Sequence, residues 1–128
     1  MSRITIITDG APQPVGPYSQ GIKAENLVFV SGQIALDPET GKLIDGDIKE
    51  QTQRALKNVE SVLTAGNSSL DGAVKVTVYL SDIADFPIVN DVFGEFFSKQ
   101  PPAREAVQVA GLPKGAKIEI SAIGLARS

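Results

Sequence analysis

The sequence contains no cysteine and no histidine. These two absences exclude thiol nucleophiles, disulfides, serine–histidine triads and zinc sites made of His and Cys. The spacing of a calcium-binding loop is missing too, and so are the glycine-rich strings that cradle nucleotide phosphates. We therefore expect no metal and no nucleotide, and we expect chemistry that rests on Arg, Glu, Tyr, Ser and backbone groups.

Tryptophan is also absent, and the 5% of aromatic residues offers little material for stacking on nucleic-acid bases. The net charge of −3 has the wrong sign for binding a phosphate backbone. No apolar stretch is long enough to span a membrane, and the first residues lack the apolar core of a signal peptide. We expect a cytoplasmic protein that binds neither membranes nor nucleic acid.

Two segments have the apolar periodicity of helices. The first covers residues 47–65, with Asp47 as its N-cap and Gly66 as its stop. The second covers about 85–98, with Pro87 in its first turn and the prolines at 101 and 102 after it. Each is amphipathic, so each should bury one face.

Strands are predicted around residues 3–7, on both sides of a Glu25-Asn26 turn, and at 73–80, 104–109 and 117–126. The order β-β-β-α-β-α-β-β predicts one α+β domain over residues 1–128, with both helices on one face of a mixed sheet. The other face would carry Tyr79, Ile123 and Leu125 without cover from the chain itself. A partner subunit is the expected cover.

Two charged side chains are the main candidates for chemistry. Arg104 follows Pro-Pro-Ala, and its guanidinium suits a carboxylate; the commoner role of such a residue is a surface or interface salt bridge. Its neighbour Glu105 should point to the other face of the strand and leave Arg104 unneutralised. Glu119 lies on the last strand, where it is either a catalytic carboxylate or a solvated partner of Lys117.

Three uncharged residues are further candidates, and two of them have two interpretations each. Tyr18 follows a Gly-Pro turn and either lines a pocket or packs with its hydroxyl in water. Gly32 either allows a ligand close to the backbone or marks a β-bulge. Asn90 interrupts the second helix, where a hydrogen bond from the helix to a loop would explain it.

Four segments together resemble the RidA (YjgF-like) family of imine deaminases: G-P-Y-S-Q at 16–20, V-S-G-Q at 30–33, P-P-A-R at 101–104 and GLPKGAKIEI at 111–120. They stand in the family's order and at its spacing, within a likeness from about residue 4 to 126. The resemblance implies a chorismate-mutase-like fold, assembled as a homotrimer with a central barrel and with clefts between subunits. It also implies a 2-iminobutanoate/2-iminopropanoate deaminase that acts on small imino and enamino acids without a cofactor.

The resemblance assigns roles to individual residues. It implies that Arg104 binds the substrate carboxylate, that Glu119 activates water, and that Tyr18 and Ser31 belong to the catalytic set. Gly32 could add a backbone contact, and Asn90 falls near another cleft position. Many relatives have Cys where this chain has Ala106; the contact there uses the backbone carbonyl, so deamination does not need the thiol. Glu105 replaces a small polar residue, which leaves the preferred imine open.

Three other functions are alternatives to imine deamination. A mutase-like pericyclic catalyst would need several cations around a dianion, and beyond Arg104 the candidate strands offer only Lys75 and Lys117. A ligand-sensing or client-binding module of the same fold is the non-enzymatic alternative, and the presence of Arg104 favours catalysis over it. A ribonuclease activity is associated with some relatives, but the acidic balance and the missing histidine argue against it.

Overall fold

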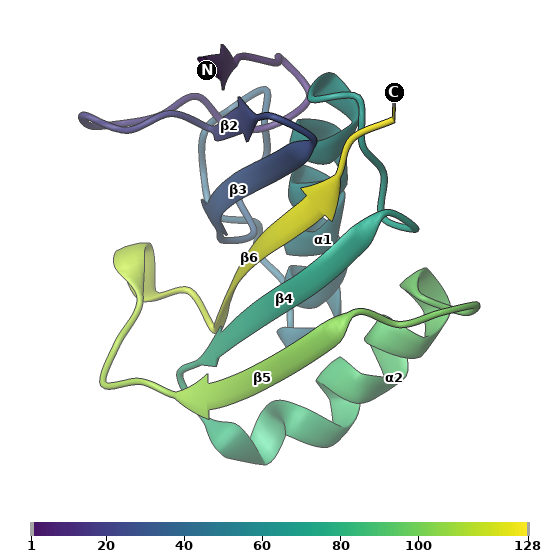
Figure 1. The fold of residues 1–128 in the computed structure, drawn as a ribbon. Helices are drawn as coiled ribbons and strands as arrows, with labels where there is room; N and C mark the ends of the chain where they lie inside the picture. Colours follow the sequence, from purple (N-terminus) through teal and green to yellow (C-terminus); the bar gives the residue numbers. More distant parts are fainter. Residues whose placement is uncertain (1, 128) are drawn as a thin grey trace.

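The computed structural model describes residues 2–127 and consists of one sheet and two helices (Figure 1). The elements follow the order that the sequence predicts, which confirms the α+β class. The helices are α1 (Ile48–Ala65) and α2 (Phe86–Phe96), with short 3-10 turns η1 (Ile83–Asp85) and η2 (Pro113–Gly115). The strands are β1 (Arg3–Ile6), β2 (Gly21–Ala24), β3 (Leu27–Gln33), β4 (Ala73–Leu80), β5 (Ala103–Gln108) and β6 (Ile118–Leu125).

The six strands lie in the order β1-β2-β3-β6-β4-β5, with β5 parallel to β4 and the other neighbours antiparallel. β5 is therefore an edge strand. The N–H of Val109, just after β5, donates to the Leu80 carbonyl at 2.9 Å. Because backbone groups alternate sides along a strand, the N–H and C=O of Arg104 and Ala106 face the open edge, where this chain has no further strand.

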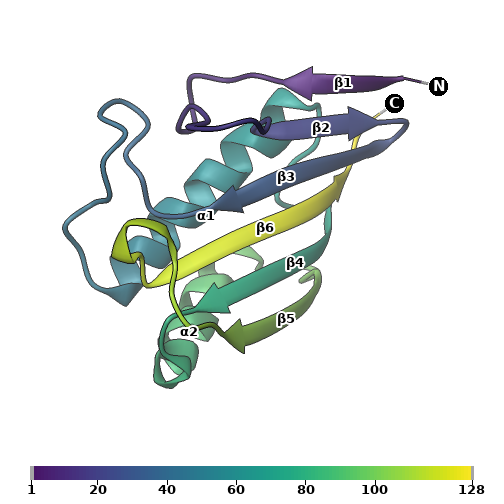
Figure 2. The ribbon, with the colours of Figure 1, turned by 90° about the vertical axis from the view of Figure 1, so that its left-hand side faces the viewer.

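Both helices cover one face of the sheet, and the hydrophobic core lies between them and the strands (Figure 2). The side chains of Val76 and Val78 alternate with more exposed neighbours along β4, as the half-buried pattern predicts. A capping box fixes the start of α1: Asp47 Oδ1 accepts from the Glu50 N–H at 2.9 Å, and Glu50 Oε1 accepts from the Asp47 N–H at 3.2 Å.

The helix ends differ from the predictions. Gly66 does end α1, but its φ is −90°, and Asn67 takes the left-handed conformation at φ 65°. Gly66 is needed for packing instead, because a Cβ there would lie 2.7 Å from the Ile6 side chain. α2 ends at Phe96, two residues before the predicted Ser98 and well before the prolines. Phe97 leaves the helical conformation, and its ring lies 5.4 Å from that of Phe93.

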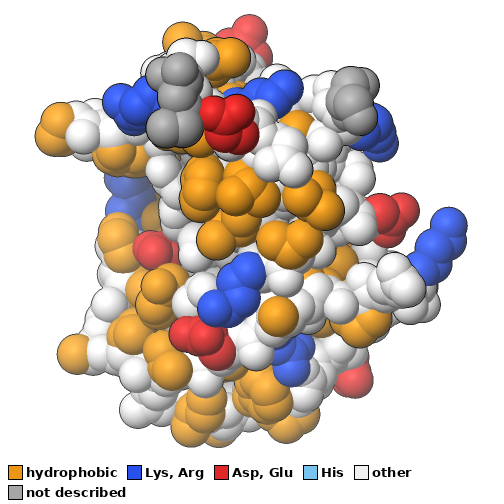
Figure 3. Space-filling model, in the orientation of Figure 1, with side chains coloured by type: hydrophobic (Ala, Val, Ile, Leu, Met, Phe, Trp, Pro, Cys, Tyr) orange, Lys and Arg blue, Asp and Glu red, His pale blue; other side chains and the backbone are white. Residues whose placement is uncertain are grey.

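The opposite face of the sheet is open, as predicted. Hydrophobic side chains gather over β3 and β6 on this face (Figure 3). Leu125 is 45% exposed and Phe29 39%, while Ile123 is half-buried. Within residues 2–127, no helix is long and apolar enough to cross a membrane.

One ion pair crosses the open face. Lys75 Nζ lies 3.1 Å from Glu105 Oε1 and links β4 to β5. It is the single salt bridge of the described chain, and it confirms that Glu105 points away from Arg104. The proposed pairing of Glu119 with Lys117 is absent from the same residues.

Candidate active site

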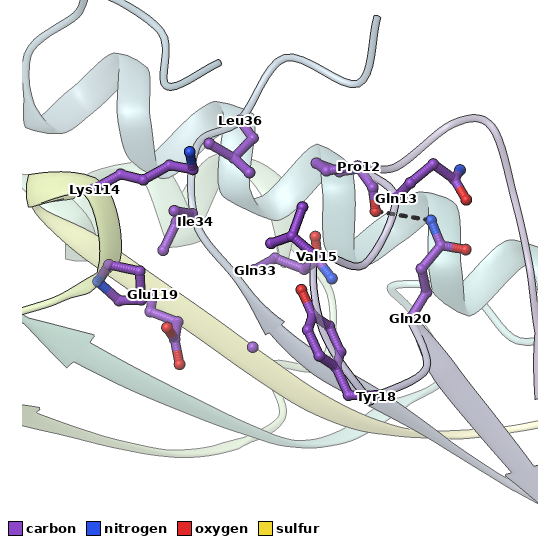
Figure 4. A pocket seen from close by; sticks show the side chains of 12 residues that line it. Pro12, Gln13, Val15, Tyr18, Gln20, Gln33, Ile34, Leu36, Lys114 and Glu119 are labelled. Carbon is purple, nitrogen blue, oxygen red and sulfur yellow. Dashed lines mark hydrogen bonds between the residues drawn. The ribbon is translucent and has the colours of Figure 1, made fainter. Parts of the chain in front are cut away.

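A pocket of about 320 Å³ opens where β3 ends and β6 begins (Figure 4). The proline-rich segment before β2 forms one wall, and η2 forms another. The lining combines apolar side chains with three glutamines and Tyr18, and Glu119 is the one carboxylate among them. The lining residues are Pro12, Gln13, Val15, Tyr18, Gln20, Gly32, Gln33, Ile34, Leu36, Pro113, Lys114 and Glu119.

Glu119 reaches the pocket because Gly32 leaves space for its carboxyl group. A Cβ at position 32 would lie 2.8 Å from Glu119 Cδ, and still closer to one carboxylate oxygen. The register between β3 and β6 also shifts between Val30 and Gln33. Gly32 thus lies at a β-bulge, as one of its two interpretations predicts. The group that approaches it closely is the Glu119 side chain, and a ligand contact at Gly32 stays a prediction.

Burial raises the pKa of the Glu119 carboxyl above its ordinary value. The side chain is half-buried, and no cation of the described chain pairs with it. A carboxylate with a raised pKa is a stronger base than an exposed one. The pocket therefore holds a candidate general base.

Replacing Glu119 by glutamine is expected to raise the melting temperature at neutral pH. Because burial raises its pKa, the folded chain binds this proton more tightly than the unfolded chain. The free energy of unfolding therefore falls as the pH rises from the ordinary carboxyl pKa through the raised one. Thermal melts at pH 4 and pH 8 check this: the variant should gain at pH 8 and not at pH 4. An equal gain at both values would contradict the assignment.

Tyr18 and Ser31 occupy different places relative to the pocket. Tyr18 lines it and is 52% exposed. Ser31 is absent from the lining; its hydroxyl donates to the Ser19 carbonyl at 2.6 Å, and its N–H donates to the Gln20 carbonyl at 3.0 Å. Ser31 thus ties the segment that carries Tyr18 to the end of β3.

Arg104 lies elsewhere, at the start of β5 and on the helix-covered face. Its guanidinium carbon stands 5.1 Å from the centre of the Phe86 ring and 5.2 Å from that of Phe93. These aromatic faces of α2 hold the guanidinium by cation–π contacts. A second hollow of about 380 Å³ opens beside it, lined by Phe93, Gly94, Phe97, Pro101, Pro102 and Arg104.

Ala106 lies two residues after Arg104 on β5, and Asn90 lies in the sequence of α2 between Phe86 and Phe93, whose rings contact Arg104. Ala106 is half-buried on the same face of β5, and its carbonyl faces the open edge. Asn90 is exposed on α2, one turn from Phe86 and from Phe93. Its side chain makes no hydrogen bond with residues 2–127, so the expected tie from helix to loop is not formed there.

A single chain does not bring the two charged candidates together. Tyr79 of β4 stands beside Glu119, whereas Val76 stands beside Arg104. Tyr79 and Val76 are an odd number of residues apart, so their neighbours lie on opposite faces of the sheet. The predicted residues therefore form two half-sites: Glu119, Gly32 and Tyr18 at the pocket, and a second group of Arg104, Ala106 and Asn90 beside α2.

The apolar walls of the pocket and the residue that holds them could not be identified from the sequence. Pro12, Val15 and Leu36 carry no signal beyond their hydrophobicity. Lys114 lies in the segment GLPKG and Gln20 in G-P-Y-S-Q. Their positions in these two family-like segments are the one signal that could have pointed to them. Along the described chain, no three acidic side chains cluster closely enough to hold a metal ion.

Comparison with known proteins agrees with this architecture. The family described as Endoribonuclease L-PSP matches residues 8–126. A RutC family protein of Pyrococcus abyssi is 51% identical over 96% of this chain and 97% of its own length. The human 2-iminobutanoate/2-iminopropanoate deaminase is 43% identical over 96% of this chain and 90% of its own.

The chain belongs to the RidA family. Among solved structures, Escherichia coli TdcF with bound serine superposes with a TM-score of 0.90, at 40% identity, and covers 98% of this chain and 99% of its own. The family resemblance seen in the four segments is thereby confirmed. The roles of the individual residues and the trimer stay predictions.

Proposed function

We propose that this RidA-family chain is a 2-iminobutanoate/2-iminopropanoate deaminase whose cleft forms between two copies. The observation that carries the proposal is the half-buried Glu119 carboxyl beside Gly32, whose pKa burial raises. Among the residues that line its pocket, Lys114 is the one cation, and it is exposed. The unneutralised Arg104 stands on the other half-site, and a neighbouring copy would supply it to bind the substrate carboxylate.

A homotrimer is the assembly that we propose. The open face carries exposed hydrophobic side chains, and the backbone of β5 at Arg104 and Ala106 is free at the edge. A head-to-tail contact closing into a ring would join one copy's Arg104 edge to the next copy's Glu119 pocket. Light scattering tests this assembly, and a stable monomer would exclude the shared cleft.

The proposed reaction is hydrolysis of the C=N bond of 2-iminopropanoate or 2-iminobutanoate. Arg104 binds the carboxylate with its guanidinium, and the Ala106 carbonyl accepts the imine N–H. Glu119 takes a proton from water as the water oxygen attacks C2. That proton passes to the nitrogen and gives a carbinolamine. Glu119 then takes the hydroxyl proton and delivers it to the nitrogen as the C=O bond forms and the C–N bond breaks, so ammonia and the 2-keto acid leave. Disposal of such reactive imines is a form of metabolite damage control.

The reaction also proceeds without an enzyme in water, so a modest acceleration is sufficient. Positioning of the imine and water against one base can provide it. The raised pKa of Glu119 supports this role, since a general base works best when its pKa approaches the working pH. No cofactor enters the proposed steps.

The substitution Gly32→Ala is expected to lower kcat by about 10²-fold while the chain still folds. The added Cβ would collide with the Glu119 carboxyl, which is the mobile end of a side chain and can move away. The base is then displaced without damage to the core. Paired measurements of kcat and melting temperature check this, with Gly111→Ala as control because a Cβ there meets nothing within 4 Å. If the Gly32→Ala variant were fully active, the proposed role of Glu119 as the base would be wrong.

The deciding assay generates the imine in situ and follows its capture by semicarbazide. An amino-acid oxidase or a PLP-dependent dehydratase supplies the imine, and the protein is added or withheld. Wild-type protein should suppress semicarbazone formation because it hydrolyses the imine first. If it never does, a ligand-sensing module of the same fold replaces the enzyme.

A further inference from the structure

The buried side chain of Gln20, which lines the pocket, makes four hydrogen bonds to the backbone. It is 2% exposed, at the end of the G-P-Y-S-Q segment and just before β2. Its Oε1 accepts from the Thr8 N–H at 2.8 Å. Its Nε2 donates to the carbonyls of Thr8 at 3.0 Å, Ala11 at 3.1 Å and Pro12 at 3.0 Å. Two N–H bonds thus serve three acceptors, so at least one is shared.

Beyond Gln20, the 9–19 segment is held mainly near its two ends, by the burial of Ala11 and by a hydrogen bond from the Ser31 hydroxyl. Residues 9–19 belong to no helix or strand, and its prolines have no N–H to donate. Val15 is 82% exposed, so packing does little to fix it. Yet this segment supplies Pro12, Val15 and Tyr18 to the pocket wall that faces Glu119 (Figure 4).

We propose that Gln20 is a positioning residue of the active site: its carboxamide holds the 9–19 segment at the distance from Glu119 that binds the imino acid. This inference rests on the proposed function. Gln20 acts through the backbone of Thr8, Ala11 and Pro12 and does not take part in the chemistry. Its loss should therefore affect substrate binding more than the chemical step.

The test uses two variants of the full-length protein, Gln20→Met and Gln20→Glu. Methionine matches the size of glutamine and loses all four hydrogen bonds, so KM should rise about 10-fold or more while kcat changes less than about threefold. An ionised glutamate cannot donate to the three carbonyls, but its protonated form can donate one bond. For Gln20→Glu, the ratio of its KM to that of wild type should fall as the pH is lowered.

Ser68→Ala is the control for a merely structural loss. Ser68 is also 2% exposed, and its hydroxyl donates to the Leu125 carbonyl at 2.7 Å, at the far end of β6 from the pocket. The Ser68→Ala substitution should lower the melting temperature, because this hydrogen bond is lost, and leave KM unchanged. The positioning role is overturned if Gln20→Met keeps the wild-type KM, or if the KM ratio of Gln20→Glu does not respond to pH.

Amide hydrogen exchange separates this inference from the proposed function. Exchange at Thr8 should accelerate in Gln20→Met, which loses the acceptor of its N–H, and exchange along 9–19 should accelerate in both Gln20 variants, relative to wild type and to Ser68→Ala. If wild type shows no deaminase activity, the proposed function fails, and faster exchange still supports Gln20 as the tie of this wall. Unchanged exchange overturns that role, whatever the activity.

Discussion

Replacing Arg104 by alanine is expected to lower kcat/KM for 2-iminopropanoate by roughly one to four decades, or about 2 to 5 kcal/mol. In the proposed cleft this guanidinium is the anchor for the substrate carboxylate. The rings of Phe86 and Phe93 hold it in place, which reduces the rotamer freedom that binding would otherwise remove. Steady-state kinetics with imine generated in situ measures the loss.

Two further variants make this result specific. Arg104→Lys keeps the charge but loses the planar pair of donors, so it should recover only part of the activity. Arg3→Ala removes the same charge from exposed strand β1 and should stay close to wild type. If Arg3→Ala and Arg104→Ala lost activity equally, general attraction would explain the result, and the anchoring role would be wrong.

The helices and the sheet could be predicted because their signals are local. The α1 stripe, its Asp47 cap and the alternation along β4 each depend on residues a few positions apart. The early end of α2 could not be predicted in this way, because Phe97 leaves the helix to pack against Phe93. The left-handed residue after α1 is Asn67 and not Gly66. Gly66 has a different role, because a Cβ at this position would collide with Ile6.

The candidate site was harder to predict because it depends on register. The sequence identified Arg104 and Glu119, and strand alternation gave the direction of each relative to its immediate neighbours. Arg104 lies on β5 and Glu119 on β6. Whether the two side chains lie on the same face of the sheet depends on the register with which each strand pairs with β4, and the hydrophobic pattern does not determine that register. The role of Gln20 could not be predicted from the sequence for a similar reason. Its partners are backbone carbonyls up to 12 residues away, which no motif encodes.

On the other half-site, the carboxyl group of Glu119 is the proposed general base. Glu119→Gln is expected to lower kcat by about 10² to 10⁴, because the amide cannot take the proton from water. The wild-type rate should fall as the pH drops through the raised pKa of Glu119, since the protonated carboxyl is no longer a base. The residual rate of the variant should lack this decline. A parallel pH profile in both proteins would show that another group is the base.

Mixing the two inactive variants tests whether the cleft is shared. Arg104→Ala retains Glu119, and Glu119→Gln retains Arg104, so a contact between one copy of each can hold an intact pair. Random reassembly from equal amounts into rings should restore roughly a quarter of the wild-type activity, because one in four contacts joins the two intact residues. A protein with both substitutions, mixed with Glu119→Gln, should restore nothing, since no copy then supplies Glu119. If the first mixture also stays inactive after subunit exchange is verified by mass, both residues must act within one copy, in conflict with their places on opposite faces of the sheet.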